Sequence, residues 1–247
     1  ANPHYDYNDS DWAHVNSFWP VPGEDAILFS PRHQDGVYKL NLTTSEIEWA
    51  ITEPDEDFGP DLASKVLTPI GDNFEYCYGQ HAVSMLPDGR IFVFDNGDGR
   101  SKDADKEMSN DDPNNYSRAV IYEVNEKDKT VRQIWQYGKE RGAELYSMFI
   151  CDVDYLGPNH YLIDFGGILD YSTGKSWSES AGTSKIIEIE NDRVIGELKL
   201  DANTYRVERM NPYDVAEGEY NLTKNPGKQI GKLVVNEVFL NQYMYQG

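Results

Sequence analysis

The segment Gly79-Gln80-His81-Ala82-Val83-Ser84 has an upstream counterpart in Asp11-Trp12-Ala13-His14-Val15-Asn16-Ser17, and the pair gives the strongest indication of the fold. Both contain His-x-x-Ser, and both open an apolar segment that is followed by a turn and a second strand-like run. The turns are Asp88-Gly89 and Pro22-Gly23. The two histidines are separated by close to one four-stranded repeat plus a loop. The pattern therefore predicts that they occupy one register of a repeat and face the same place in the fold.

Strand-like runs surround both motifs in groups of four, and turn signals separate them. The first group lies at 12–21, 26–30, 37–42 and 46–51, and the second at 81–86, 90–95, 117–125 and 130–137. A third group follows at 148–155, 160–165, 184–190 and 193–199. Between the first two groups runs an acidic connection, 53–75, in which we expect a short helical turn at 62–67.

Three tandem four-stranded units predict an all-β fold built from β-propeller blades. The expected blades are approximately 11–52, 79–138 and 146–200, and 201–247 forms a C-terminal closing segment. Each blade puts its first strand beside the central channel, so His14 and His81 should line the channel mouth. Because three blades do not close a propeller, we expect the remaining blades to come from preceding sequence or from another chain.

Composition limits the partners of the chain. Its 247 residues include 22 basic and 43 acidic side chains, which gives a net charge of −21. This field repels nucleic acid and anionic membranes, and no apolar run approaches the roughly 18 residues of a membrane span. We therefore expect neither nucleic acid nor membrane as a partner. The chain does not begin with Met and carries no signal peptide, so we interpret it as a mature protein or a fragment.

The two cysteines, Cys77 and Cys151, fit no zinc or redox spacing. A disulfide between them is left open, and the simpler interpretation is that each is a small buried residue. No Ser-His-Asp signature, phosphate loop or zinc motif stands out. We expect no metal and no cofactor.

His81 is the sharpest catalytic candidate, because a neutral imidazole is a good nucleophile and general base near pH 7. The alternative is a structural histidine bonded to a neighbouring blade. The repeated register of His14 and the nearby Arg32 favour a functional role. Arg32 and a protonated His14 should lower the pKa of His81, since like charges disfavour the imidazolium.

Arg32 follows the second strand-like run, in Phe29-Ser30-Pro31-Arg32-His33-Gln34. Arginine binds tetrahedral oxyanions with its planar fork, so Arg32 is a candidate anion-binding residue. The alternative is a surface salt bridge. His33 should point the opposite way and be structural.

Asp95-Asn96-Gly97-Asp98-Gly99-Arg100 looks like part of a calcium loop. It lacks the glutamate that such loops place downstream, as well as the flanking helices. We therefore prefer a tight loop whose glycines take positive φ.

Several of these segments, in this order, resemble bacterial arylsulfate sulfotransferases, which need no nucleotide sulfate donor. The resemblance runs from about residue 11 to about residue 210. It is carried by five segments: 11–17, 29–34, 79–82, Phe-Asp-Asn-Gly-Asp-Gly-Arg (94–100) and Val-Arg-Gln-Ile-Trp-Gln-Tyr-Gly (131–138).

The resemblance implies a six-bladed propeller and ping-pong transfer of a sulfuryl group from a phenyl sulfate to a phenol through a sulfohistidine. His81 would be the nucleophile, and His14 and Arg32 would bind the sulfuryl oxygens with Asn16 beside them. Tyr205 would line the aromatic pocket. The family uses a further histidine in an earlier blade, which this chain does not contain.

By the same resemblance, the partners are a small aryl sulfate donor and a phenol acceptor, the location is the periplasm or the cell exterior, and a homodimer is left open. A second hypothesis is a non-catalytic propeller that binds an anionic ligand or a protein at the channel mouth.

Overall fold

The computed structural model describes residues 11–55, 58–102, 112–170 and 182–210. The chain divides into two units, Ala1–Arg209 and Met210–Gly247, and the described strands lie in the first. Most of the expected closing segment, 211–247, lies outside the described residues, as does His4.

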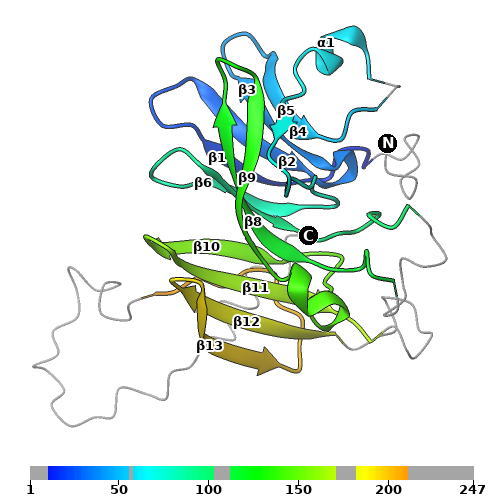
Figure 1. The fold of residues 1–247 in the computed structure, drawn as a ribbon, viewed down its shortest axis with the longest axis vertical. Helices are drawn as coiled ribbons and strands as arrows, with labels where there is room; N and C mark the ends of the chain where they lie inside the picture. The colour runs from blue at the N-terminus through cyan, green and yellow to red at the C-terminus, as the bar shows by residue number, and fades with distance from the viewer. Residues whose placement is uncertain (1–10, 56–57, 103–111, 171–181, 211–247) are drawn as a thin grey trace, which may run out of the picture. The chain divides into compact units, whose positions relative to one another are not determined.

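Three sheets built mainly of antiparallel strands make up the first unit, so the all-β prediction is confirmed (Figure 1). The first sheet has the order β1-β2-β3-β4, from β1 (Val15–Pro20), β2 (Ala26–Pro31), β3 (Gly36–Asn41) and β4 (Ile47–Thr52). The third has the order β10-β11-β12-β13, from β10 (Asp152–Gly157), β11 (His160–Ile168), β12 (Thr183–Glu190) and β13 (Arg193–Leu200). The six-bladed ring stays a prediction.

The second sheet has five strands where the sequence predicts four. Its order is β5-β9-β8-β7-β6, from β5 (Thr68–Ile70), β6 (His81–Met85), β7 (Ile91–Asp95), β8 (Arg118–Asn125) and β9 (Thr130–Tyr137). The extra strand β5 comes from the acidic connection and pairs in parallel with β9. A three-residue strand containing a proline carries too little pattern to be read from sequence.

Short helical segments join the strands. The helix α1 (Pro60–Ala63) lies slightly before the expected helical turn, and two 3-10 segments, η1 (Arg32–Gln34) and η2 (Lys139–Leu145), were not expected. Two first strands also begin later than expected, because left-handed residues precede them: His14 (φ 45°) before β1, and Ile150 and Cys151 (φ 54° and 90°) before β10.

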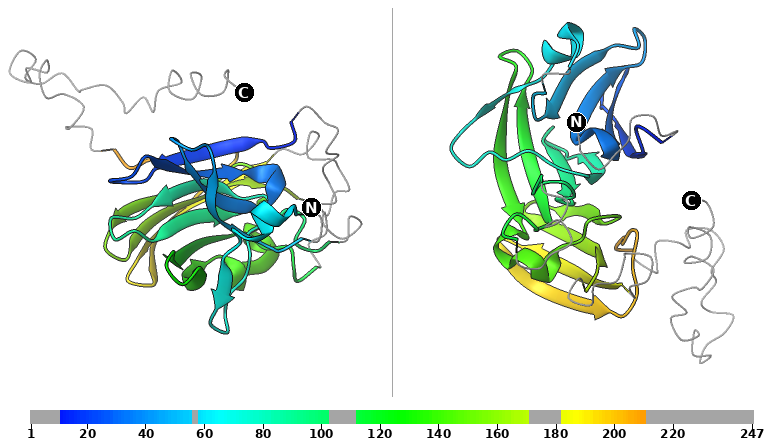
Figure 2. Two further views of the ribbon diagram at one scale, coloured as in Figure 1. Left: turned by 90° about the horizontal axis from the view of Figure 1, so that it is seen from above. Right: turned by 90° about the vertical axis from the view of Figure 1, so that its right-hand side faces the viewer.

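The middle sheet lies between the first and the third (Figure 2). Both of its faces are buried in apolar cores. Along β7, Ile91 and Val93 belong to an apolar core shared with the first sheet, whereas Phe92 and Phe94 belong to one shared with the third. Each fully buried aromatic side chain contributes about 1.5–3 kcal/mol. Strand β6 contacts β1 on one side and β10 on the other. The first strands of the three sheets therefore lie side by side.

Candidate active site

His81 is the first residue of β6 and is only 3% exposed. Its Nδ1 lies 2.8 Å from Oδ1 of Asn96 and 3.1 Å from the main-chain oxygen of Gly79. The amide nitrogen of Asn96 donates to two carbonyl oxygens, those of Ser147 (2.8 Å) and Ile150 (2.9 Å). This orientation leaves Oδ1 of Asn96 as an acceptor, so Nδ1 of His81 carries the proton. The Nε2 atom therefore keeps its lone pair.

The surroundings keep the His81 ring uncharged. Burial, and after it the charge of Arg32, lower the pKa of His81 to about 3, against the opposing hydrogen bonds to Asn96 and Gly79. The charge of His14 adds a smaller effect in the same direction. The sequence predicts the direction of this shift, but its largest cause is the desolvation of the ring, which only the fold supplies.

Backbone irregularities at the starts of β1 and β6 set the directions of the side chains at the site. The pairing register shifts between Val15 and Ser17 in β1, and between His81 and Ser84 in β6. Such bulges turn side chains away from strict alternation and are common next to active sites. Asn16, in the first bulge, donates from Nδ2 to the main-chain oxygen of Gln80 at 2.7 Å, directly before His81. This hydrogen bond brings Asn16, expected beside His14 and Arg32, to the residue that precedes His81.

Gln80 ties the first two sheets together and was missed by the sequence analysis. Its side chain is fully buried, and its amide nitrogen donates to Oγ of Ser30 and to the main-chain oxygens of Pro31 and Gly36, at 2.8–3.2 Å. No sequence pattern distinguishes a glutamine that joins two sheets from one on the surface.

His14 lies directly before β1 and pairs through Nδ1 with a carboxylate oxygen of Asp11. The ring of His33 stacks on that of His14, with centroids 4.7 Å apart, and Nε2 of His33 lies 3.2 Å from Nη1 of Arg32. The expectation that His33 points away is therefore wrong. Strand alternation fails here because the chain turns into η1 directly after β2.

Asp11, His14 and His33 bring three potential metal-ligand atoms within 4.8 Å of one another. Both ring nitrogens of His33 are already engaged, however. Nδ1 lies 2.6 Å from the main-chain oxygen of Asp11, and Nε2 faces the guanidinium of Arg32. The contacts describe a hydrogen-bonded cluster that orients His14.

Arg32 opens η1 and joins the three sheets. Its Nη2 donates to Oδ2 of Asp98 at 2.5 Å and to the main-chain oxygen of Met148 at 3.1 Å. The two side chains of the ion pair are 12% and 4% exposed, so the alternative of a surface salt bridge is wrong. Asp98 fixes the guanidinium beside His81 and was not singled out by the sequence analysis.

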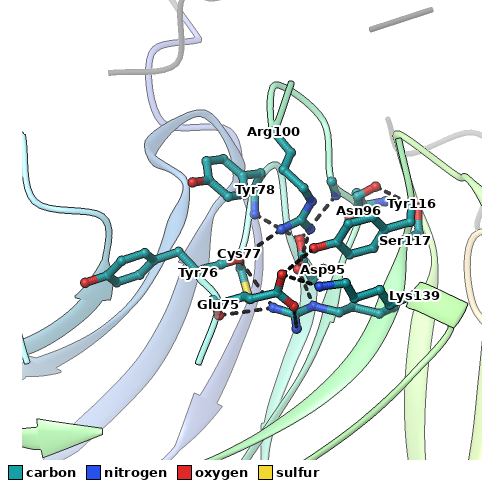
Figure 3. Close-up of polar contacts among 12 residues, drawn as sticks. Glu75, Tyr76, Cys77, Tyr78, Asp95, Asn96, Arg100, Tyr116, Ser117 and Lys139 are labelled. Atoms are coloured by element: carbon teal, nitrogen blue, oxygen red, sulfur yellow. Dashed lines mark hydrogen bonds and ion pairs between the residues drawn. The ribbon is translucent and has the colours of Figure 1, made fainter. Parts of the chain in front are cut away.

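The loop 95–100 is tight, and Gly97 and Gly99 have positive φ, as predicted (79° and 82°). A Cβ at Gly97 would lie 2.2 Å from the main-chain oxygen of Tyr116, so only glycine fits. The carboxylate of Asp95 accepts from Arg100 (2.6 Å) and Arg118 (2.8 Å) in a buried charge network (Figure 3). With Asp98 paired to Arg32, both loop carboxylates are engaged by arginines, which is not the arrangement of a calcium loop.

The network around Asp95 extends to Glu75 and Lys139, which Figure 3 shows beside it. Breaking a buried ion pair typically costs about 3–5 kcal/mol, because it leaves an uncompensated charge. The network holds the loop that carries both Asn96 and Asp98. It therefore supports the orientation of His81 and Arg32 indirectly.

Tyr205 belongs to segment 203–206, which has no regular secondary structure, and its ring lies next to that of His81. The two rings are in an edge-to-face arrangement with centroids 6.2 Å apart. Thr204 holds this segment to the third sheet, because its Oγ1 donates to Asp164 at 2.6 Å and its main-chain N donates to Gly166 at 3.1 Å. Tyr205, predicted to line the site, is thus brought beside the histidine.

Both cysteines are buried free thiols, so the open disulfide is not formed. Sγ of Cys77 lies 3.2 Å from the hydroxyl of Tyr122, and Sγ of Cys151 lies 3.0 Å from Oγ of Ser147. Burial raises the pKa of Cys77 to about 12, and it raises that of Cys151 as well. Neither thiol is suited to act as a nucleophile.

Fold and site together define a β-sheet protein with a buried, neutral histidine at the start of β6. The family model of arylsulfotransferase (ASST) matches residues 2–213. The chain therefore belongs to the arylsulfotransferase (ASST) family.

Two curated relatives are named arylsulfate sulfotransferase AssT. That of Escherichia coli O6:H1 is 36% identical over 174 residues, which cover 63% of this chain and 28% of the relative. That of Lelliottia amnigena is 33% identical over 180 residues, or 66% of this chain and 29% of the relative. The matched part thus spans less than a third of either relative. None of the helices in the described ranges is long and apolar enough to cross a membrane.

Proposed function

We propose that the protein transfers a sulfuryl group between phenols and that His81 carries the group as a sulfohistidine. The observation that supports this most is the orientation of Asn96, which fixes the proton of His81 on Nδ1 and leaves a neutral, buried Nε2. A ring in this state attacks an electrophile without first losing a proton. No nucleotide donor takes part.

In the first half-reaction, Nε2 of His81 attacks sulfur and an N–S bond forms. The bond from sulfur to the aryl oxygen breaks, and the phenolate leaves with the electron pair. In the second half-reaction the oxygen of another phenol attacks sulfur, its proton passes to solvent, and the N–S electron pair returns to Nε2. The proton on Nδ1 stays in place and donates to Asn96 throughout.

The same surroundings that lower the pKa of His81 also keep the intermediate reactive. Sulfurylation puts positive charge on the ring, and burial and the charge of Arg32 disfavour that charge. Oδ1 of Asn96 offsets part of the cost, because it faces the Nδ1 proton. The balance favours a sulfohistidine that passes its group on.

The remaining predicted residues surround the sulfuryl group in this proposal. Arg32 supplies a permanent charge near the sulfuryl oxygens, held in place by Asp98. His14 and Asn16 supply further donors at the start of β1. Tyr205 lines the side on which the aryl group lies. By family resemblance, the enzyme works in the periplasm or outside the cell.

Steady-state kinetics of the complete natural polypeptide that carries this chain test the proposal. We expect ping-pong kinetics with a phenyl sulfate donor and a phenol acceptor, and loss of turnover in His81→Asn. His160→Asn is the matched control, because His160 pairs with Glu188 on the third sheet. A His81→Asn protein with full turnover contradicts the assignment.

A second candidate is a non-catalytic protein that binds an anion at the same site. It is favoured by the existing pairing of Arg32 with Asp98, which is a structural use of the arginine. It predicts retention of aryl sulfates without release of phenol.

A further inference from the structure

Segment 203–206 brings a second cation, Arg206, to the site. We propose that Arg206 stabilises the negative charge that develops on the phenolate oxygen as it leaves sulfur. The role extends to the acceptor phenol, whose oxygen passes through the same position when it attacks. This inference rests on the proposed sulfuryl transfer.

The position of Arg206 follows from three contacts. Its Nη2 donates to the main-chain oxygen of Asn16 at 3.3 Å, although the two residues lie near opposite ends of the described sequence. Its Cζ lies 5.9 Å from the ring centroid of Tyr205, which in turn lies 6.2 Å from that of His81. The guanidinium thus borders both the residue proposed to bind sulfuryl oxygens and the ring proposed to line the aryl group.

The two arginines suit different parts of the substrate. Arg32 is almost buried and is held by Asp98 and by the carbonyl of Met148, so it offers a fixed charge. Arg206 is exposed and rests on a long hydrogen bond to a carbonyl, so its fork can turn toward a charge that appears during reaction. In an in-line displacement the leaving oxygen departs opposite the nucleophile. A cation beside the aryl group is therefore placed to stabilise the leaving phenolate oxygen.

The acidic groups around Arg206 do not neutralise its guanidinium. Asp152 on β10 and Tyr205 are titratable groups close enough to Arg206 to feel its charge. Burial raises the pKa of Asp152 to about 7, so near neutral pH its carboxyl is only partly ionised and competes weakly for the guanidinium. In a chain of net charge −21, a cation so placed also attracts an anionic donor.

Leaving-group dependence of the complete natural polypeptide tests the proposal. Phenyl sulfate releases a phenol with a pKa of about 10, whereas nitrophenyl sulfate releases a phenolate that needs little help. In Arg206→Gln we expect kcat/KM to fall roughly tenfold for phenyl sulfate and much less for nitrophenyl sulfate. Arg206→Lys should retain part of the difference. Arg209→Gln changes an exposed arginine that follows this segment and pairs with Glu188, and it should leave both rates unchanged.

If kcat/KM falls equally for both donors, Arg206 has only a structural role. If kcat/KM does not fall, Arg206 has no role in the reaction. Either result overturns the proposal. Failure of the proposed function is separate, because the unmodified protein would then turn over neither donor. In that case the role of Arg206 is tested by titrating bound nitrophenol and following its ionisation by absorbance across pH. The proposal requires a lower pKa for nitrophenol bound to the unmodified protein than to Arg206→Gln. Equal values, or no binding, count against it.

Discussion

At the scale of single residues, the site depends on one amide. Asn96 has two donor bonds to carbonyl oxygens, so its side chain has a single orientation that satisfies all partners. Through that orientation it selects the tautomer of His81. A free imidazole has only a weak preference between its two tautomers. A second residue is therefore needed to fix which ring nitrogen is unprotonated.

We therefore expect Asn96→Ala to lower kcat roughly 100-fold, the range in which loss of an oriented histidine partner falls. The NMR shifts of the ring nitrogens report the cause directly: His81 should carry its proton on Nδ1 in the unmodified protein and lose this preference in the variant. Asn125→Ala, at the exposed end of β8, is the control. An Asn96→Ala enzyme with unchanged kcat would show that the tautomer does not depend on this amide.

At the scale of elements, segment 203–206 completes the site although it belongs to no sheet. It lies close to β11 because residue 166 is a glycine: a Cβ there would lie 1.8 Å from the main-chain oxygen of Thr204. A methyl group at this position must push the segment away, and Tyr205 with it.

Gly166→Ala should therefore raise KM for aryl sulfates roughly tenfold or more, because misplacement of a positioning group by about 1 Å has effects of this size. Fluorescence or hydrogen exchange of the segment should report its release. Gly196→Ala on β13 is the matched control, since a Cβ there meets its nearest neighbour at an ordinary 3.8 Å. Equal KM values for both variants would contradict the role of the segment.

The extent to which the sequence predicts the fold also differs by element. Strands with alternating residues and clear turns, such as β8, β9 and β12, agree with the structure to within about a residue. The errors fall where backbone conformation overrides pattern. The left-handed His14 and Cys151 delay β1 and β10, and the turn η1 reverses the expected direction of His33.

For the site, the sequence predicts the residues with distinctive chemistry and misses those that hold them. His14, His81 and Arg32 stand out because imidazole and guanidinium groups are able to bind anions or to react. Asn96, Asp98 and Gln80 are ordinary polar residues whose importance arises only when three sheets come together. Long-range partners of this kind carry no local signal.

At the scale of the whole molecule, buried ionisable groups make stability depend on pH in opposite directions. The lowered pKa of His81 contributes stability that is present above its ordinary value of 6.5 and lost as pH falls toward about 3. Burial raises the pKa of Asp164 from 3.8 to about 7. Its contribution is fully present below pH 3.8 and is lost as pH rises to about 7.

The sign for Asp164 gives a direct prediction. Asp164→Asn removes the cost of an ionised buried carboxylate, so it should stabilise the protein more at pH 8 than at pH 4, by up to about 4 kcal/mol. Urea unfolding at both pH values measures this difference, and the contribution of His81 cancels because both proteins share it. Asp201→Asn, an exposed acid near the end of the third sheet, is the control. A difference of the opposite sign would contradict the buried environment of Asp164.

In the proposed mechanism, Nε2 of His81 carries the sulfuryl group between donor and acceptor. The most direct measurement is to mix the complete natural polypeptide with an aryl sulfate in the absence of acceptor, quench in alkali to preserve the labile N–S bond, and map the modification by peptide mass spectrometry. We expect one sulfuryl group on His81, removed by acid or by added phenol. A modified residue other than His81, or phenol release without any modified histidine, would contradict it.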